Sequence, residues 1–276
     1  VAEMVPRWSH RKLWFMTLSS IIALVLIALT WKQVHHWKND ISLFGHSLEV
    51  TSNNWLSHNN LGNALEKEGL INDAITHYQE ALRIRPDFET AHNNLGVALG
   101  KKGRSNDAIK HYQEALRIKP DYADAHYNLA SALAKKGFTD DAIRHYQEAV
   151  RIRPDFEIGH YDLGNTLAKK GFTDDAIRHY QEAVRIRPDY AKAHNNLGNA
   201  LSRKGLTDDA IRHYREAVRI RPDNAGAHYN LGNAYALKGN LDMAVKHFRK
   251  AVQINPDFSY ARNSLARALM LQKQNQ

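Results

Sequence analysis

The chain of 276 residues carries 38 Lys and Arg against 29 Asp and Glu, which gives a formal net charge of +9, and it contains no cysteine. The lack of cysteine excludes disulfides and thiolate metal sites and is compatible with either redox compartment. A basic balance favours acidic partners or an anionic surface. Because no RNA- or DNA-binding motif accompanies it, we expect no direct contact with nucleic acid.

The first predicted element is a transmembrane helix at 13–31, preceded by a juxtamembrane segment at 1–12. The segment reads LWFMTLSSIIALVLIALTW and contains no charged residue. At a rise of ~1.5 Å per residue, a helix of this length covers about 28 Å, close to the ~30 Å hydrocarbon core of a bilayer. Tryptophans flank both ends, as interfacial aromatic belts do: Trp8, Trp14, Trp31 and Trp37.

Two other interpretations of this segment are a cleaved signal peptide and a buried core helix. A signal peptide has a shorter apolar region followed by a small-x-small cleavage site, which is missing here. Apolar residues lie on all sides of this predicted helix, which argues against the buried core helix. Arg7, Arg11 and Lys12 precede the span whereas Lys32 and Lys38 follow it, so the positive-inside rule favours an exported, periplasmic solenoid.

Residues 32–54 are expected to form a connector and an N-terminal capping half-repeat. When the sequence is shifted by 34 residues, Ile41 aligns with Ile75 and Phe44 aligns with Tyr78. The pattern predicts a single helix at 40–52 that would join the solenoid to the membrane span with little linker.

A 34-residue period governs the rest of the chain. Proline returns at this interval, at Pro86, Pro120, Pro154, Pro188, Pro222 and Pro256. The stretch GFTDDAIRHYQEAVRIRPD occurs unchanged at 137–155 and 171–189. This period is the length of a helix–turn–helix solenoid unit. Six units are predicted, followed by a C-terminal capping helix and tail at 259–276: 55–88, 89–122, 123–156, 157–190, 191–224 and 225–258.

Each unit contains the signals of two short helices. In the first helix Leu61 and Leu65 share one face, and Gly69 follows as the residue that ends the helix. The second helix is expected to begin from a cap such as Thr139. It ends before Pro154, because proline cannot continue a helix. One helix pair cannot bury its own apolar face, so neighbouring units must stack.

These positions resemble the tetratricopeptide repeat (TPR) family. The first unit supplies the matching residues Leu61, Gly62, Ala74, Tyr78, Ala81 and Pro86. The chain departs from the family pattern at the early aromatic position, which is histidine in all six units, and at Ala130, which replaces a glycine. The resemblance covers 55–258. It implies an all-α, right-handed superhelical solenoid, here preceded by one transmembrane helix.

No catalytic residue, cofactor site or metal site is predicted. The sequence contains no nucleophile motif and no glycine-rich phosphate loop. Twelve of the sixteen histidines fall on repeat positions, which indicates a structural or surface role before a metal-binding one. We therefore expect a non-catalytic chain without a cofactor.

The candidate binding residues recur on the first helix of each unit. The TPR solenoid of O-linked N-acetylglucosamine transferase is similar, and there an asparagine at this place lines the inner groove and grips extended peptide backbones. An amide offers both a donor and an acceptor. The first row is Asn60, Asn94, Asn128, Asn196 and Asn230, with Asp162 interrupting it, and the second row is Asn63, Asn165, Asn199 and Asn233. A cationic row follows at Lys67, Lys101, Lys135, Lys169 and Arg203, and aromatic surface is added by Tyr127, Tyr161 and Tyr229.

Two functions are consistent with this pattern. The first is a membrane-anchored scaffold that binds an extended, acidic protein or peptide in the concave groove, in a larger membrane complex. The second is the C-terminal recruiting arm of a larger multi-span membrane glycosyltransferase, because VAEMVPRW and the following span loosely resemble the last span of bacterial membrane proteins of that type with C-terminal TPRs. Duplicated surface polarity without a ligand is the remaining interpretation of the asparagine rows.

Overall fold

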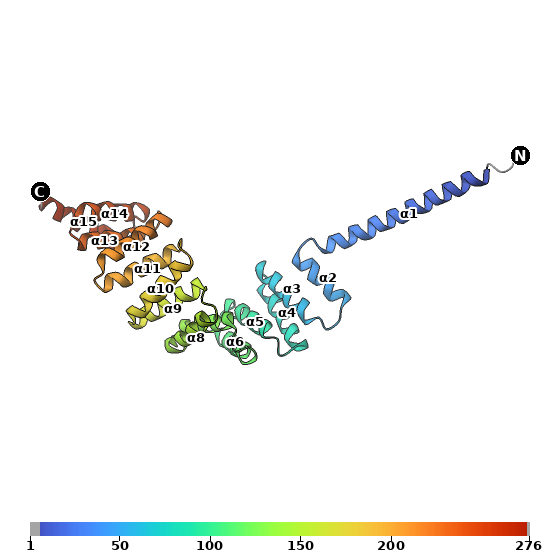
Figure 1. Cartoon of the computed structure of the whole chain (residues 1–276), viewed down its shortest axis with the longest axis horizontal. Helices are drawn as coiled ribbons and strands as arrows, with labels where there is room; N and C mark the ends of the chain where they lie inside the picture. Colours follow the sequence, from blue (N-terminus) through green and yellow to red (C-terminus); the bar gives the residue numbers. More distant parts are fainter. Residues whose placement is uncertain (1–5, 275–276) are drawn as a thin grey trace. The chain divides into compact units, whose positions relative to one another are not determined.

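The computed structural model describes residues 6–274, and within this range the secondary structure is entirely helical (Figure 1). Residues 1–5 and 275–276, which include the start of the predicted juxtamembrane segment and the end of the predicted tail, lie outside the described residues. The helices are α1 Pro6–His36, α2 Asp40–Val50, α3 Trp55–Lys67, α4 Ile71–Ile84, α5 Glu89–Lys101, α6 Ser105–Ile118, α7 Ala123–Lys135, α8 Thr139–Ile152, α9 Glu157–Lys170, α10 Thr173–Ile186, α11 Ala191–Arg203, α12 Thr207–Ile220, α13 Ala225–Leu237, α14 Leu241–Ile254 and α15 Ser259–Gln274.

The chain divides into two compact units, residues 1–118 and residues 119–276, which are described separately. In the first unit α3 pairs with α4 and α5 pairs with α6, and α4 packs on α5. In the second unit the same arrangement joins α7 with α8, α9 with α10, α11 with α12 and α13 with α14. The predicted all-helical TPR fold is therefore confirmed.

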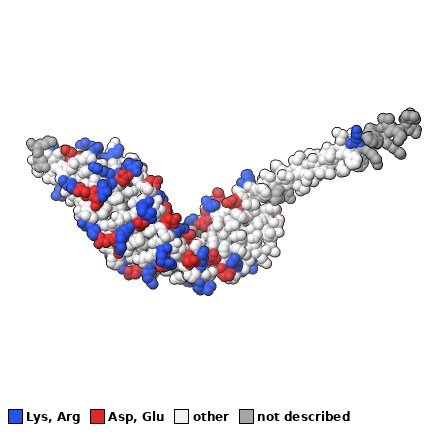
Figure 2. All heavy atoms as spheres, viewed as in Figure 1, with Lys and Arg blue, Asp and Glu red and all other residues white. Residues whose placement is uncertain are grey.

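The helix α1 is long and apolar enough to cross a membrane, judged by its length and composition. Its segment Lys12–Trp31 has 20 residues and a mean hydropathy of 2.3, and none of it is buried. In Figure 2 the visible surface of this segment is almost entirely uncharged. This full exposure does not fit a buried core helix, whereas a membrane span and a signal sequence both remain compatible with it.

Within each repeat, a tyrosine or phenylalanine ring of the second helix packs against the backbone of the first. Gly198 shows why the first helix needs a small residue there, because a Cβ built on it would lie 2.6 Å from Cε1 of Tyr214. Tyr214 itself is 3% exposed. The close approach of backbone and ring explains the Leu-Gly pair of the repeat pattern.

The turn between the two helices depends on a glycine with positive φ. Gly69 has φ of 80°, and the amide of Leu70 donates to the carbonyl oxygen of Leu65 at 2.9 Å. This contact satisfies a carbonyl at the end of α3 as the Schellman motif does. The predicted role of Gly69 as the residue after the helix is confirmed.

The predicted cap at Thr139 is wrong. Thr139 is the first residue of α8, and the preceding Phe138 occupies the N-cap position without a side-chain hydrogen bond. The tight turn after Gly137 brings the Thr139 hydroxyl back toward the Gly137 carbonyl oxygen, at 3.3 Å, instead of toward the helix. The duplicated stretch repeats this geometry, since Phe138 has φ −77° and ψ 68° and Phe172 has φ −77° and ψ 67°.

Candidate functional site

The predicted binding residues lie on the first helices of the repeats and form what we call the asparagine face. Its two amide rows are half-buried, and its cationic row is exposed. The rows belong to α3 and α5 in the first unit and to the odd-numbered helices α7 to α13 in the second unit. Each unit therefore carries its own part of the face.

The amide rows are hydrogen-bonded from one repeat to the next. In the first unit, the Nδ2 of Asn94 donates to the Oδ1 of Asn59 at 3.1 Å and to the Oδ1 of Asn63 at 3.0 Å. The hydroxyl of Tyr78 lies 2.8 Å from the same Asn63 oxygen and also 2.8 Å from a carboxylate oxygen of Glu66, and its single proton serves these two acceptors. The oxygen of the second-row amide thus already has an internal donor in Asn94.

The second unit repeats this pattern. Asn196 donates to Asn165 at 2.8 Å, and Asn230 donates to Asn199 at 3.1 Å. The hydroxyls of Tyr180 and Tyr214 donate to the same two oxygens, each at 2.8 Å. These acceptors are used internally. The Nδ2 of Asn199, which has no acceptor among the described residues, is therefore better placed to meet a ligand than the Nδ2 of Asn165, which donates to Asp162 at 3.4 Å.

Asp162 reverses the direction of these hydrogen bonds, because it accepts at a position where the first-row asparagines donate. It accepts from the hydroxyl of Tyr127 at 2.8 Å and from the Nδ2 of Asn165 at 3.4 Å. Burial raises the pKa of this carboxyl, while these two hydrogen bonds and the charge of Lys192 act in the opposite direction. Asp162 is thus a half-buried acceptor in a row of amides.

The three predicted tyrosines pack between repeats. The ring centroid of Tyr127 lies 4.9 Å from that of Phe156, the Tyr161 ring lies 4.9 Å from Tyr190, and the Tyr229 ring lies 5.0 Å from Phe258. All three tyrosines are half-buried. Their rings stabilise the junction between successive repeats and present one edge to the asparagine face.

The cationic row differs between the two units. In the first unit Lys67 lies 3.8 Å from a carboxylate oxygen of Asp40, and Lys101 lies 2.7 Å from one of Glu66. In the second unit no carboxylate among the described residues pairs with Lys135, Lys169 or Arg203. The residues equivalent to Glu66, thirty-five positions before each of these cations, are Gly100, Ala134 and Ala168, so the internal carboxylate partner is missing.

A polar pocket of about 360 Å³ opens on the asparagine face of the second unit. Its walls come from the three successive helices α11, α12 and α13 and contain four of the predicted binding residues. The lining residues are Asn199, Ser202, Arg203, Tyr214, Asn230 and Asn233. The structure therefore brings these predicted residues together around one cavity.

Paired histidines inside each repeat were not foreseen from the sequence. The Nδ1 atoms of His160 and His179 lie 3.1 Å apart, and the Nε2 of His160 lies 3.1 Å from the carbonyl oxygen of Pro154. The Nε2–H of His160 donates to that carbonyl, so its Nδ1 accepts from the Nδ1–H of His179. The pairs are His58–His77, His92–His111, His126–His145, His160–His179, His194–His213 and His228–His247. The constant spacing of 19 residues between the two histidines of each pair is the feature of the sequence that could have suggested a contact.

Burial lowers the pKa of three histidines on the second helices most strongly. It lowers the pKa of His179 to about 4, and the neighbouring His160 and Arg178 lower it further against the charges of Asp175 and Glu182. The pKa values of His213 and His247 are lowered to about 4 by the same main cause. No group of three or more metal-ligating side chains occurs among the residues that the structure describes.

Several solved structures share this fold. The structure of YrrB, described as a TPR protein with an unusual peptide-binding site, is 24% identical with a TM-score of 0.63, over 68% of this chain and 96% of that chain. MamA is 26% identical with a TM-score of 0.55, over 59% and 95%. The pilF structure of Pseudomonas aeruginosa is 17% identical with a TM-score of 0.68, over 77% and 97%.

Two curated protein O-mannosyl-transferase sequences are also similar. Protein O-mannosyl-transferase F38B6.6 of Caenorhabditis elegans is 36% identical over 72 residues, which are 26% of this chain and 10% of that protein. Protein O-mannosyl-transferase Tmtc3 of Drosophila melanogaster is 36% identical over 70 residues, or 24% and 8%. The chain therefore spans about a tenth of the length of these relatives.

Family models agree with the repeat architecture. The model of the TPR repeat matches 67–103, 101–137 and 132–171. Models of the tetratricopeptide repeat match 161–225 and 225–258. Together these matches cover well over half of the sequence, and the chain belongs to the tetratricopeptide repeat family.

Proposed function

We propose that this protein is a membrane-anchored scaffold that binds an extended, acidic polypeptide on its asparagine face. The observation that carries the proposal is the row Lys135, Lys169 and Arg203, whose cations have no carboxylate partner among the described residues. Second-row amides beside this row offer N–H donors to a peptide backbone. An unpaired cationic row attracts carboxylates, and a row of amides recognises main chain without regard to sequence.

Charge reversal tests the proposal more cleanly than replacement of asparagines, because Asn196 and Asn230 also hold neighbouring repeats together. The variant Lys135→Glu, Lys169→Glu and Arg203→Glu is expected to bind a fluorescent poly-glutamate peptide at least about tenfold more weakly than the unmodified chain, which corresponds to ~1.4 kcal/mol. The difference should shrink as salt rises, since exposed charges are screened. Fluorescence anisotropy at low and high salt measures both effects.

The chain offers a matched control one residue away. Lys136, Lys170 and Lys204 carry the same charge, but Lys170 pairs with Asp140 and Lys204 pairs with Asp174. Reversal of these three lysines should leave peptide affinity nearly unchanged. Equal losses in both triple variants would contradict a specific site and would point to net charge alone.

Membrane anchoring through 13–31 is the second part of this proposal. Full-length protein expressed in bacteria is expected to stay in the membrane pellet after a carbonate wash, because an apolar helix of this length fits the bilayer core. A version that starts at Asp40 should be recovered in the supernatant. Release of the full-length chain by carbonate would refute a spanning helix, and protease protection of the repeats in spheroplasts would test the proposed periplasmic side.

The second candidate function is a recruiting arm of a larger membrane glycosyltransferase. The similarity to two protein O-mannosyl-transferases, 36% identical over 70–72 residues, favours it. The mass of the native protein in its own membranes, detected with an antibody against the repeats, separates the two candidates. A species much larger than 31.5 kDa with further apolar spans would favour the arm of an enzyme.

A further inference from the structure

Asn233 differs from the other second-row amides of the second unit. In the preceding repeat, the side-chain oxygen of Asn199 accepts from a tyrosine hydroxyl and from the next first-row asparagine. At Asn233 the ring is Phe248, which has no hydroxyl, and Ser264 stands in place of the next asparagine. The amide of Asn233 consequently makes no hydrogen bond with the rest of the described chain.

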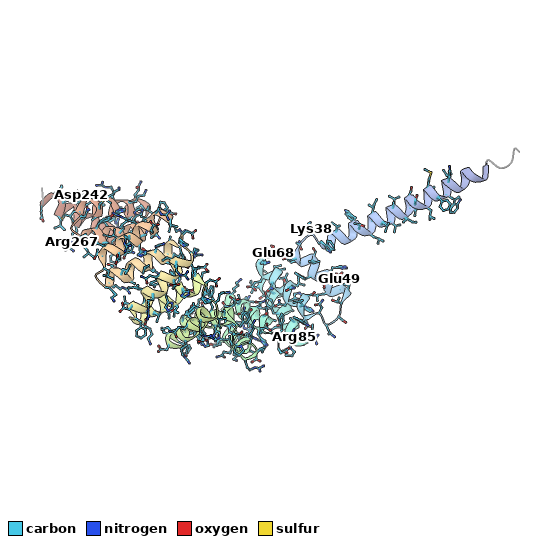
Figure 3. All side chains as sticks on the ribbon, viewed as in Figure 1. Lys38, Glu49, Glu68, Arg85, Asp242 and Arg267 are labelled. Atoms are coloured by element: carbon cyan, nitrogen blue, oxygen red, sulfur yellow. The ribbon has the colours of Figure 1, made fainter. Side chains whose placement is uncertain are left out.

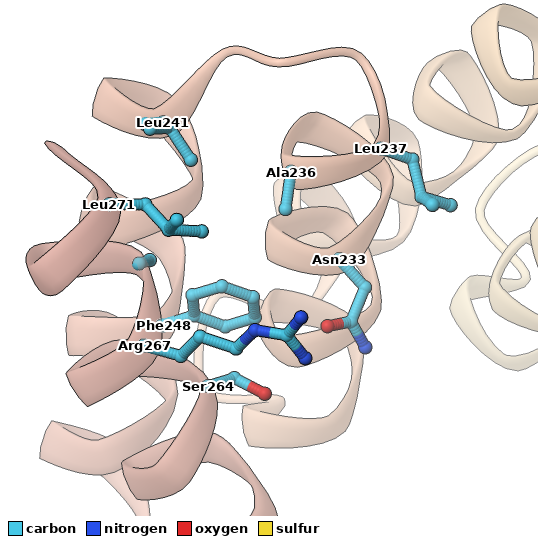
Figure 4. Close-up of a pocket in the computed structure, with 9 residues that line it drawn as sticks. Asn233, Ala236, Leu237, Leu241, Phe248, Ser264, Arg267 and Leu271 are labelled. Carbon is cyan, nitrogen blue, oxygen red and sulfur yellow. The ribbon is translucent and has the colours of Figure 1, made fainter. Parts of the chain in front are cut away.

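Two pockets meet at this unpaired amide. One is the polar pocket of about 360 Å³ that contains Arg203. The other has about 460 Å³ and lies between α13, α14 and α15, with Asn233 and Arg267 on its rim (Figure 4). The close-up shows the guanidinium of Arg267 directed toward the Asn233 amide, with the Phe248 ring behind them.

The larger pocket combines a cation with an apolar wall. Arg267, labelled near the end of the chain in Figure 3, is exposed and has no carboxylate partner in the described part of the chain. Leu241 and Leu271 line one side of the pocket and Ala236 the other. Leu237 completes the lining and is 72% exposed.

We propose that this end of the asparagine face is the specificity site of the groove and that it selects a peptide with an acidic side chain next to a large apolar one. The proposal rests on the function proposed above. The carboxylate would lie against Arg267, and the apolar side chain would fill the pocket beside Leu241 and Leu271. The free amide of Asn233 would hold the peptide backbone between them.

Each contact is suited to its partner. A guanidinium binds a carboxylate through two parallel hydrogen bonds. Apolar pockets with a few oriented polar groups are the usual form of ligand sites in proteins. An amide with a free donor and a free acceptor can bind both polar groups of an extended backbone residue. The second-row amides Asn165 and Asn199 lack the free acceptor, so the site is confined to the last repeat and α15.

Short fluorescein-labelled Gly/Ser peptides with one Asp and one Leu test the inference by anisotropy on the full chain in detergent. The Asp and the Leu are placed adjacent or separated by up to three residues, so that the series also determines which spacing gives the tightest binding. At the best spacing, replacement of Leu by Ser is expected to weaken binding about tenfold, through loss of apolar burial. Replacement of Asp by Asn should weaken it several-fold.

Variants of the protein locate the effect. Leu237→Ser and Arg267→Glu should each weaken the Asp/Leu peptide, whereas Leu206→Ser and Arg262→Glu, which are exposed and outside both pockets, should not. Phe248→Tyr restores the ring found in the other five repeats and supplies the missing donor to Asn233. This variant should fold normally and bind the peptide a few-fold more weakly.

The outcomes separate the two proposals. Equal affinity for the Leu and Ser peptides, or no effect of Leu237→Ser and Arg267→Glu, overturns the specificity site even if poly-glutamate binding still depends on Lys135, Lys169 and Arg203. Absence of binding by every spacing of the Asp/Leu series overturns it as well. Equal losses of poly-glutamate affinity in the two triple charge-reversal variants would instead refute the proposed function.

Discussion

Lowering the pH from 7 to 4.5 is expected to destabilise the second unit by about 4 kcal/mol through His179, His213 and His247 alone, after allowance for their partial exposure. Burial lowers the pKa of each of these imidazoles from 6.5 to about 4. In the unfolded chain they bind a proton below about 6.5, and in the folded chain only below about 4. The unfolded state therefore binds more protons in this window, so the stabilising contribution is complete above 6.5 and is lost as the pH falls through 4.

The neighbouring charges do not cancel this effect. His179 faces His160 and Arg178, which lower its pKa, and Asp175 and Glu182, which raise it less than burial lowers it. Protonation of His160 at Nδ1 would in addition replace the hydrogen bond that it accepts from the His179 Nδ1–H with a contact between two donors. Urea unfolding followed by circular dichroism at several pH values measures the loss.

Substitution of the three histidines by glutamine provides the comparison. Gln keeps an N–H donor but does not titrate, so the triple variant should lose much less stability between pH 7 and 4.5. His46 lies outside the six pairs, and His46→Gln should retain the acid sensitivity of the unmodified chain. An unchanged urea midpoint across the range, or an equal loss in the triple variant, would show that the pairs do not control acid stability.

Replacement of Tyr180 by alanine should cost about 3–5 kcal/mol of unfolding free energy, as for other buried aromatic side chains. The ring is 3% exposed and packs against the backbone at Gly164, where a Cβ would lie 2.8 Å from it. Truncation leaves a cavity and removes the hydroxyl that donates to Asn165. The same urea titration measures the change.

Tyr180→Phe separates the two contributions. It keeps the ring and removes only the hydrogen bond, so it should cost about 1 kcal/mol. Phe248 already occupies the equivalent position in the last repeat, where it is 2% exposed. A neutral Tyr180→Ala substitution would mean that the ring does not pack in the core as described.

The fold could be predicted from residues whose roles are local. Pro154 ends a helix because of its ring, and Gly69 takes a left-handed conformation that other residues avoid. The predicted helix at 40–52 corresponds to α2 at Asp40–Val50. The prediction at Thr139 was wrong because the geometry of the turn places the N-cap one residue earlier, at Phe138. A residue that favours the N-cap position cannot cap the helix from its first turn.

The contacts of the asparagine face were harder to predict, because they depend on distances between repeats. Periodicity places Asn63 and Asn94 on one face, but it does not say that they bond to each other. It also cannot distinguish Lys101, which pairs with Glu66, from Lys169, which has no such partner in the described chain. The histidine pairs lie within single repeats and were missed for a different reason, since a spacing of 19 residues does not fix the orientation of two rings.

The near-identical backbone of the turns at Phe138 and Phe172 has a consequence for how the gene can change. Each turn is joined to the next repeat by an ion pair thirty residues onward, Asp140 with Lys170 and then Asp174 with Lys204. Recombination between the two identical stretches would remove or add 34 residues and recreate the same junction, with the same partners in register. The chain can therefore lengthen or shorten its asparagine face by whole repeats in evolution while it keeps the same interface between neighbouring repeats.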